Sequence, residues 1–110
     1  MPVLLCFCAC PDAATADRIA GTLVAERLAA CVGVMQGLRS VYRWHGAVEH
    51  ADEVQLQIKT RSECLPALTA RIGELHPYEL PEVIAVEAAG GLAPYLAWVA
   101  EQTREDDRPA

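Results

Sequence analysis

Two long stretches of alternating apolar and polar residues, joined by a short turn, constrain the fold of this chain more than any other feature. Within residues 32–44, five apolar residues stand at even-numbered positions: Val32, Val34, Leu38, Tyr42 and Trp44. Residues 48–60 alternate in the same way, with Val54, Leu56 and Ile58 on one side. Such alternation is typical of β-strands. The His45-Gly46 pair predicts the turn of an antiparallel hairpin, and Gly33 and Gly37 indicate a bend or bulge in its first strand.

The predicted hairpin is too long for a small monomer to cover. Strands of this length span roughly 40 Å. The chain has 110 residues, 53% of them hydrophobic and only 22% charged. A monomer of this size buries only about 65% of the surface that its unfolded chain exposes. We therefore expect the hairpin to pair with other subunits.

The remaining periodicities predict a β-α-β-β-α-β order with a further helix at the C-terminus. A strand is expected over residues 3–9, a helix over 15–30 behind an Asp12 N-cap, and a strand over 82–87. A second helix follows a capping box formed by Thr60 and Glu63, with an apolar stripe of Leu65, Leu68, Ile72 and Leu75. This order predicts an α+β, ferredoxin-like fold with a four-stranded antiparallel sheet. Residues 1–104 are expected to form one domain, with a flexible tail over 105–110.

Composition excludes several classes of function. The net charge is −6 and basic residues are not clustered, so nucleic acid and anionic membranes are poor partners. No apolar run approaches the ~20 residues of a membrane span. Neither a phosphate-binding glycine loop nor a nucleophile elbow is present, which argues against an enzyme. Five cysteines, an odd number, favour thiols in a reducing cytoplasm over a disulfide framework.

Two segments carry candidate metal ligands. Cys6, Cys8 and Cys10 alternate, so their thiols project from one face of the first strand, roughly 7 Å from one to the next. Thiolates suit Cu(I) and zinc, although free cysteines on a central strand also pack as core residues. His76 opens a segment stiffened by Pro77 and Pro81, and its imidazole could serve as a second ligand beside Cys8.

A second set of side chains suits a small organic ligand: Tyr42, Trp44, Lys59, Tyr78 and Glu82. If subunits associate, these residues can line clefts between them. Aromatic walls with one cation and one carboxylate would fit a zwitterionic or anionic molecule. Alternatively, the same groups satisfy one another across the subunit interface.

Several motifs together resemble those of the CutA divalent-cation tolerance proteins. They are residues 28–32 (Leu-Ala-Ala-Cys-Val), 40–46 (Ser-Val-Tyr-Arg-Trp-His-Gly), 58–60 (Ile-Lys-Thr), 76–82 (His-Pro-Tyr-Glu-Leu-Pro-Glu) and 95–98 (Tyr-Leu-Ala-Trp). The resemblance implies a ferredoxin-like homotrimer in the bacterial cytoplasm, without an established enzymatic reaction, linked to copper and other divalent ions. Cys8 stands at the position that is credited with copper ligation in some relatives. Some members carry a second histidine where this chain has Leu75.

The resemblance and the residues together predict a non-enzymatic trimer that binds copper or another divalent cation weakly at Cys8 and His76. The alternative is a signalling or sensor trimer that binds a metabolite in its inter-subunit clefts. A third reading is a stable platform for a protein partner that the sequence does not identify.

Overall fold

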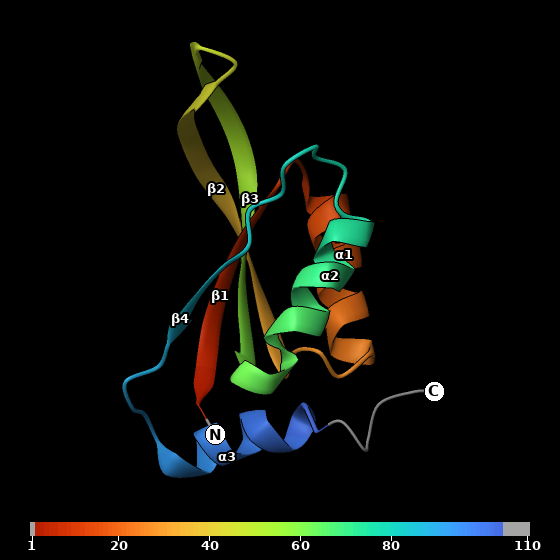
Figure 1. Ribbon diagram of the computed structural model, residues 1–110, viewed down its shortest axis with the longest axis vertical. Helices are drawn as coiled ribbons and strands as arrows, with labels where there is room; N and C mark the ends of the chain where they lie inside the picture. The colour runs from red at the N-terminus through yellow and green to blue at the C-terminus, as the bar shows by residue number, and fades with distance from the viewer. Residues whose placement is uncertain (1, 105–110) are drawn as a thin grey trace.

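The computed structural model describes residues 2–104, and the expected tail over residues 105–110 lies outside this range. The chain forms an α+β fold in which two helices cover one face of a four-stranded antiparallel sheet, as expected (Figure 1). The elements are β1 (Val3–Cys10), α1 (Ala13–Ala25), β2 (Cys31–Trp44), β3 (Ala47–Arg61), α2 (Leu65–Leu75), β4 (Ile84–Glu87) and α3 (Ala93–Gln102), with a 3₁₀ turn at Ser62–Cys64. The strand order β2-β3-β1-β4 places β1 at the centre of the sheet, which is the ferredoxin-like arrangement.

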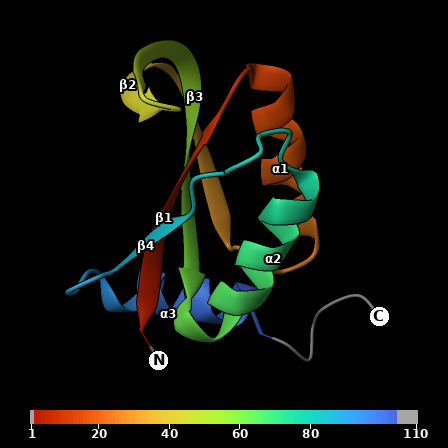
Figure 2. The same ribbon diagram turned by 45° about the horizontal axis from the view of Figure 1, so that its top comes forward.

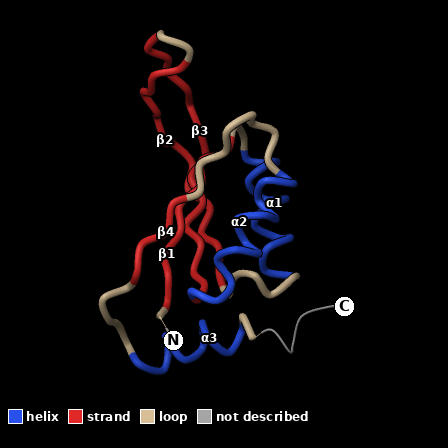
Figure 3. Tube along the Cα trace, in the orientation of Figure 1, coloured by secondary structure: helices blue, strands red, loops and turns tan. Residues whose placement is uncertain are grey.

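The long hairpin of β2 and β3 extends beyond the rest of the sheet. β1 pairs with β3 only from Val54 to Arg61, so residues 47–53 of β3 pair with β2 alone. Figure 3 shows this two-stranded arm projecting past the helices. Most of its side chains are exposed, with Val41 61% and Val48 58% accessible. An isolated two-stranded ribbon is marginally stable in water, so this arm needs another surface to cover it.

The tip of the arm is a two-residue turn whose backbone matches the sequence prediction. His45 and Gly46 both have positive φ, at 48° and 81°, as a type I′ hairpin turn requires. A register shift between Met35 and Leu38 confirms the expected bulge, and Gly37 has a φ of 88° there. Before the bulge, Val34 pairs with Leu56, and after it, Leu38 pairs with Glu53, which lies on the opposite face of β3. The apolar side chains at even-numbered positions of β2 therefore change from one face of the sheet to the other at the bulge. The prediction of a single apolar face along β2 was therefore wrong.

The core lies between the sheet and helices α1 and α2. Alternate residues of β1 and β3, among them Cys6, Cys8, Leu56 and Ile58, are fully buried against both helices. Figure 2 shows both helices on the same side of the sheet. The opposite face, which carries exposed Met35, Ile84 and Val86, is covered only in part: α3 approaches it where Lys59 lies over the Tyr95 ring.

Three local predictions need correction. Helix α1 ends at Ala25 rather than residue 30, because Arg27 adopts a φ of 58° and the Leu28 N–H closes onto the Leu23 carbonyl at 2.9 Å. The Thr60–Glu63 capping box does not form. Thr60 lies within β3 and its hydroxyl donates to the Leu28 carbonyl at 2.7 Å. The last strand begins at Ile84, so Glu82 lies in the loop before it.

Candidate functional site

A cysteine pair and a histidine meet at the edge of the core. The ligand atoms of Cys8, Cys10 and His76 all lie within 4.8 Å of one another. Cys8 and Cys10 share a face of β1, and His76 is the residue that follows α2. Both thiols are fully buried and His76 is 7% exposed. The central position of β1 and the end of α2 over it therefore create a preorganised cluster of soft ligands.

The two thiols influence each other's ionisation. A hydrogen bond between the two side chains lowers the pKa of Cys10. The same hydrogen bond, together with burial, raises the pKa of Cys8 well above its usual range. The interaction between the thiols thus makes Cys10 the easier of the two to deprotonate. Cys6, by contrast, has its pKa raised to about 11 by burial, which suits a core thiol without a metal role.

The imidazole of His76 is held by two backbone groups. Its Nδ1 accepts a hydrogen bond from the Tyr78 N–H at 3.2 Å, so the proton lies on Nε2, which donates to the Ala9 carbonyl at 2.8 Å. Both ring nitrogens are therefore occupied in this arrangement. A metal ion bound by His76 would have to displace one of these hydrogen bonds.

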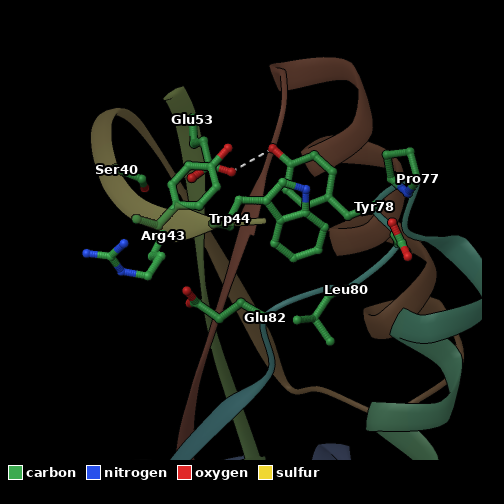
Figure 4. A pocket seen from close by; sticks show the side chains of 11 residues that line it. Ser40, Arg43, Trp44, Glu53, Pro77, Tyr78, Leu80 and Glu82 are labelled. Atoms are coloured by element: carbon green, nitrogen blue, oxygen red, sulfur yellow. Dashed lines mark hydrogen bonds between the residues drawn. The ribbon is translucent and has the colours of Figure 1, made fainter. Parts of the chain in front are cut away.

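Beside this cluster lies a second feature, which we call the aromatic–acidic pocket (Figure 4). It has a volume of about 570 Å³ and lies between the hairpin arm and the loop after α2. Its lining includes three aromatic side chains, three carboxylates and one guanidinium: Tyr42, Trp44, Tyr78, Glu53, Glu79, Glu82 and Arg43. The Tyr78 hydroxyl donates to Glu53 Oε2 at 2.6 Å. Burial, and then this carboxylate, raise the pKa of Tyr78.

The structure brings together four of the five residues named for the ligand site. Tyr42, Trp44, Tyr78 and Glu82 all line the aromatic–acidic pocket. Lys59 does not: its Nζ lies 5.4 Å from the centre of the Tyr95 ring, and interaction with Tyr95 raises its pKa. Within one protomer, the cation expected in the cleft is thus absent from the lining.

Sequence reasoning missed residues of both sites. Cys10 was expected to share a face with Cys8, but was not included with Cys8 and His76 in the predicted metal site. Glu53 was expected only to lie on the face opposite Val54, Leu56 and Ile58 and was not named for a site, yet it is only 9% exposed and accepts a hydrogen bond from Tyr78. Glu53 is followed at the same parity of its strand by two amide side chains, Gln55 and Gln57, and this contrast was a weak signal that Glu53 has a particular role.

The fold and the buried thiol–imidazole cluster define the chain as a ferredoxin-like α+β domain with potential metal ligands at the edge of its core. Residues 4–102 match the family described as CutA1 divalent ion tolerance protein. The chain belongs to this family. Within the described residues, no helix is both long and apolar enough to cross a membrane.

Individual relatives support the same assignment. The chain is 45% identical over 93 residues to the divalent-cation tolerance protein CutA of Thermus thermophilus, which covers 84% of this chain and 90% of that protein. It is 41% identical to the chloroplastic protein CutA 1 of Oryza sativa, covering 96% of this chain but only 59% of the rice protein. The crystal structure of CutA from Xylella fastidiosa superposes with a TM-score of 0.90 at 46% identity, covering 93% of this chain and 98% of that one.

Proposed function

We propose that this protein acts in tolerance to metal ions as a non-enzymatic, cytoplasmic homotrimer that binds copper at Cys8, Cys10 and His76. The observation that carries the proposal is the convergence of these three ligand atoms within 4.8 Å. Membership of a divalent ion tolerance family supports the metal-ion response. Cys10 extends the ligand pair expected from the sequence to three.

The donor set favours a soft ion. Two thiolates and an imidazole suit Cu(I) or zinc rather than magnesium or calcium, which prefer oxygen ligands. Zinc usually takes four ligands in a closed structural site, and this cluster supplies three. Binding must also remove the proton of Cys8 and one hydrogen bond of His76, so we expect modest affinity that rises with pH.

A competition titration tests the metal site. Cu(I), held in reductant with a coloured Cu(I) chelator, is offered to the wild type and to Cys8→Ser, Cys10→Ser and Cys31→Ser variants. We expect one Cu(I) per chain in the wild type and in Cys31→Ser, whose half-buried side chain lies outside the cluster. The two cluster variants should lose most of this binding while keeping the wild-type circular dichroism. Unchanged binding in a Cys8→Ala, His76→Ala double variant would refute the site.

Trimerisation is the second part of the proposal. The uncovered arm of β2 and β3 and the apolar face with Met35, Ile84 and Val86 both require a partner surface. Light scattering should give three times the 11.9 kDa chain mass at micromolar concentration. A compact single copy would contradict it. A cytoplasmic location fits the cysteines, since none of the five forms a disulfide in the described part of the chain.

A second candidate function is a sensor trimer that binds a small metabolite. The aromatic–acidic pocket favours this candidate, because its volume lies in the usual range of small-molecule sites. A thermal-shift screen separates the two candidates. Stabilisation by metals alone would count against the sensor, and stabilisation by metabolites in metal-free buffer would support it. A pull-down would test the remaining possibility of a protein partner.

A further inference from the structure

The carboxylate of Glu53 is buried without a countercharge among residues 2–104, which the structure describes. It is 91% buried, and the Tyr78 hydroxyl is the one described group that donates a hydrogen bond to it. Among the described residues it takes part in no ion pair. A buried carboxylate is costly unless it is paired, and one neutral donor on Oε2 leaves Oε1 without a partner.

The surroundings of Glu53 add negative charge. The lining of the pocket contains two further carboxylates, Glu79 and Glu82, against the single guanidinium of Arg43. Figure 4 shows the Arg43 side chain directed away from the Glu53 carboxylate, whereas Glu53 points toward Tyr78. The pocket lining therefore carries an excess of negative charge, and Glu53 is its buried member.

The aromatic side chains of the pocket complement the same kind of ligand. Tyr42, Trp44 and Tyr78 line it together with the carboxylates. Electron-rich ring faces attract organic cations, and tryptophan does so most strongly. Anions would face both the carboxylates and the ring faces, so the anionic or zwitterionic ligand expected from the sequence is disfavoured once Lys59 is absent from the lining.

We infer that the aromatic–acidic pocket binds a small organic cation, an amine or guanidine whose positive charge lies between Glu53 and the rings of Trp44 and Tyr78. This inference rests on the second proposed function, ligand binding in the pocket, and is independent of the metal cluster. The ligand supplies the countercharge that Glu53 lacks, and its apolar part contacts the aromatic lining.

Calorimetric titration of the metal-free protein tests the inference with three probes of similar length: 1,4-diaminobutane, 1,4-butanediol and succinate. The diamine should bind at least about tenfold more tightly than the diol, because only the diamine offers a charged donor to Glu53. Added salt should weaken its binding. Equal affinities for the diamine and the diol, or a preference for succinate, would overturn the inference.

Two variants locate the binding. Glu53→Gln keeps an acceptor for the Tyr78 hydroxyl but removes the charge, and should weaken diamine binding about tenfold or more. Glu87→Gln, on β4 and outside the pocket lining, should leave it unchanged. Equal weakening in both variants would mean non-specific attraction to an acidic protein and would overturn the site. Absence of diamine binding to a wild-type trimer would also overturn the site. That result would mean that a neighbouring copy of the chain fills the pocket.

These outcomes are distinguishable from failure of the proposed metal function. Cu(I) binding depends on Cys8, Cys10 and His76, so Glu53→Gln should retain it even where diamine binding is lost. Conversely, Cys10→Ser should retain diamine binding, since the Cys10 side chain is not part of the pocket lining.

Discussion

Replacing Tyr78 by phenylalanine removes one short hydrogen bond and little else. The Tyr78 hydroxyl lies 2.6 Å from Glu53 Oε2, and the acceptor carboxylate is 9% exposed. Hydrogen bonds to charged groups contribute about 1.5–3 kcal/mol, and a buried partner left unsatisfied incurs its desolvation penalty. Because Tyr78 itself is only half-buried, we expect a loss near the lower end, about 1.5–2 kcal/mol in the free energy of unfolding.

Guanidinium denaturation followed by circular dichroism measures this loss, with all variants at one protein concentration because the unfolding of an oligomer depends on it. Tyr42→Phe is the matched control. Tyr42 lines the same pocket, but no hydrogen bond joins its hydroxyl to a described residue, so its loss should stay within about 0.5 kcal/mol.

A double-mutant cycle with Glu53→Gln isolates the pair. Each single variant weakens the same contact, so the two changes in the free energy of unfolding should depart from additivity by about 1 kcal/mol or more. A Tyr78→Phe loss below about 0.5 kcal/mol, or additive changes in the cycle, would refute the assignment of stabilising energy to this contact.

The pH dependence gives an independent check. The pKa of Tyr78 is raised in the folded protein, because burial and the Glu53 carboxylate disfavour the phenolate. The stabilisation from this shift is complete below the unfolded value of about 10 and is lost as the pH rises from there toward the folded pKa. Above pH 10, the wild type should therefore lose more stability than Tyr78→Phe does. Parallel pH profiles would contradict the shift.

Four further variants test the fold, each by denaturation at fixed protein concentration. Gly46→Ala should lower stability by about 1–2 kcal/mol because Gly46 has a φ of 81°, whereas Gly21→Ala should raise it by about 0.5–1 kcal/mol because Gly21 lies in α1 with open space beside it. A rise for the former or a fall for the latter would contradict the backbone conformations. The hydrogen bond from the Thr15 N–H lowers the pKa of Asp12. The wild type therefore keeps this stabilisation above about pH 4 and loses it as the pH falls further, whereas Asp12→Asn should lack this pH dependence. If Asp12→Asn has the same acid profile as the wild type, the Asp12 cap does not cause the loss of stability in acid. Ile72→Ala should lower the free energy of unfolding by about 2–5 kcal/mol, because the Ile72 side chain projects from α2 and is fully buried in the core. A loss under 1 kcal/mol would show that the core closes around the smaller residue and leaves no cavity.

Elements with a strong local signal could be predicted from the sequence. The hairpin turn at His45-Gly46 was recognisable because few residues adopt positive φ, and the α2 stripe ended where His76-Pro77 blocks a helix. The end of α1 was missed because Leu28 keeps the helical spacing and is buried, but the chain has already turned at Arg27.

The sites depended on contacts that the sequence separates widely. Cys8, Cys10 and His76 could be named as ligand types, but only the tertiary fold brings His76, at the end of α2, to the two thiols of β1. Likewise, Lys59 and Trp44 lie on paired strands, yet the hairpin register opposes Lys59 to Cys31 and Trp44 to Ala47, at opposite ends of the ribbon.

The sequence by itself determined the order of strands and helices, the overlong hairpin and the supply of soft ligands, because each follows from local periodicity, turn chemistry or residue type. Only the tertiary structure decided which ligands meet, and that Glu53 is buried with no countercharge from the described part of the chain. The physical reason is that burial and electrostatic pairing are properties of surfaces brought together from distant parts of the chain. A strand's own alternation shows which side a residue occupies, but not what comes to cover it.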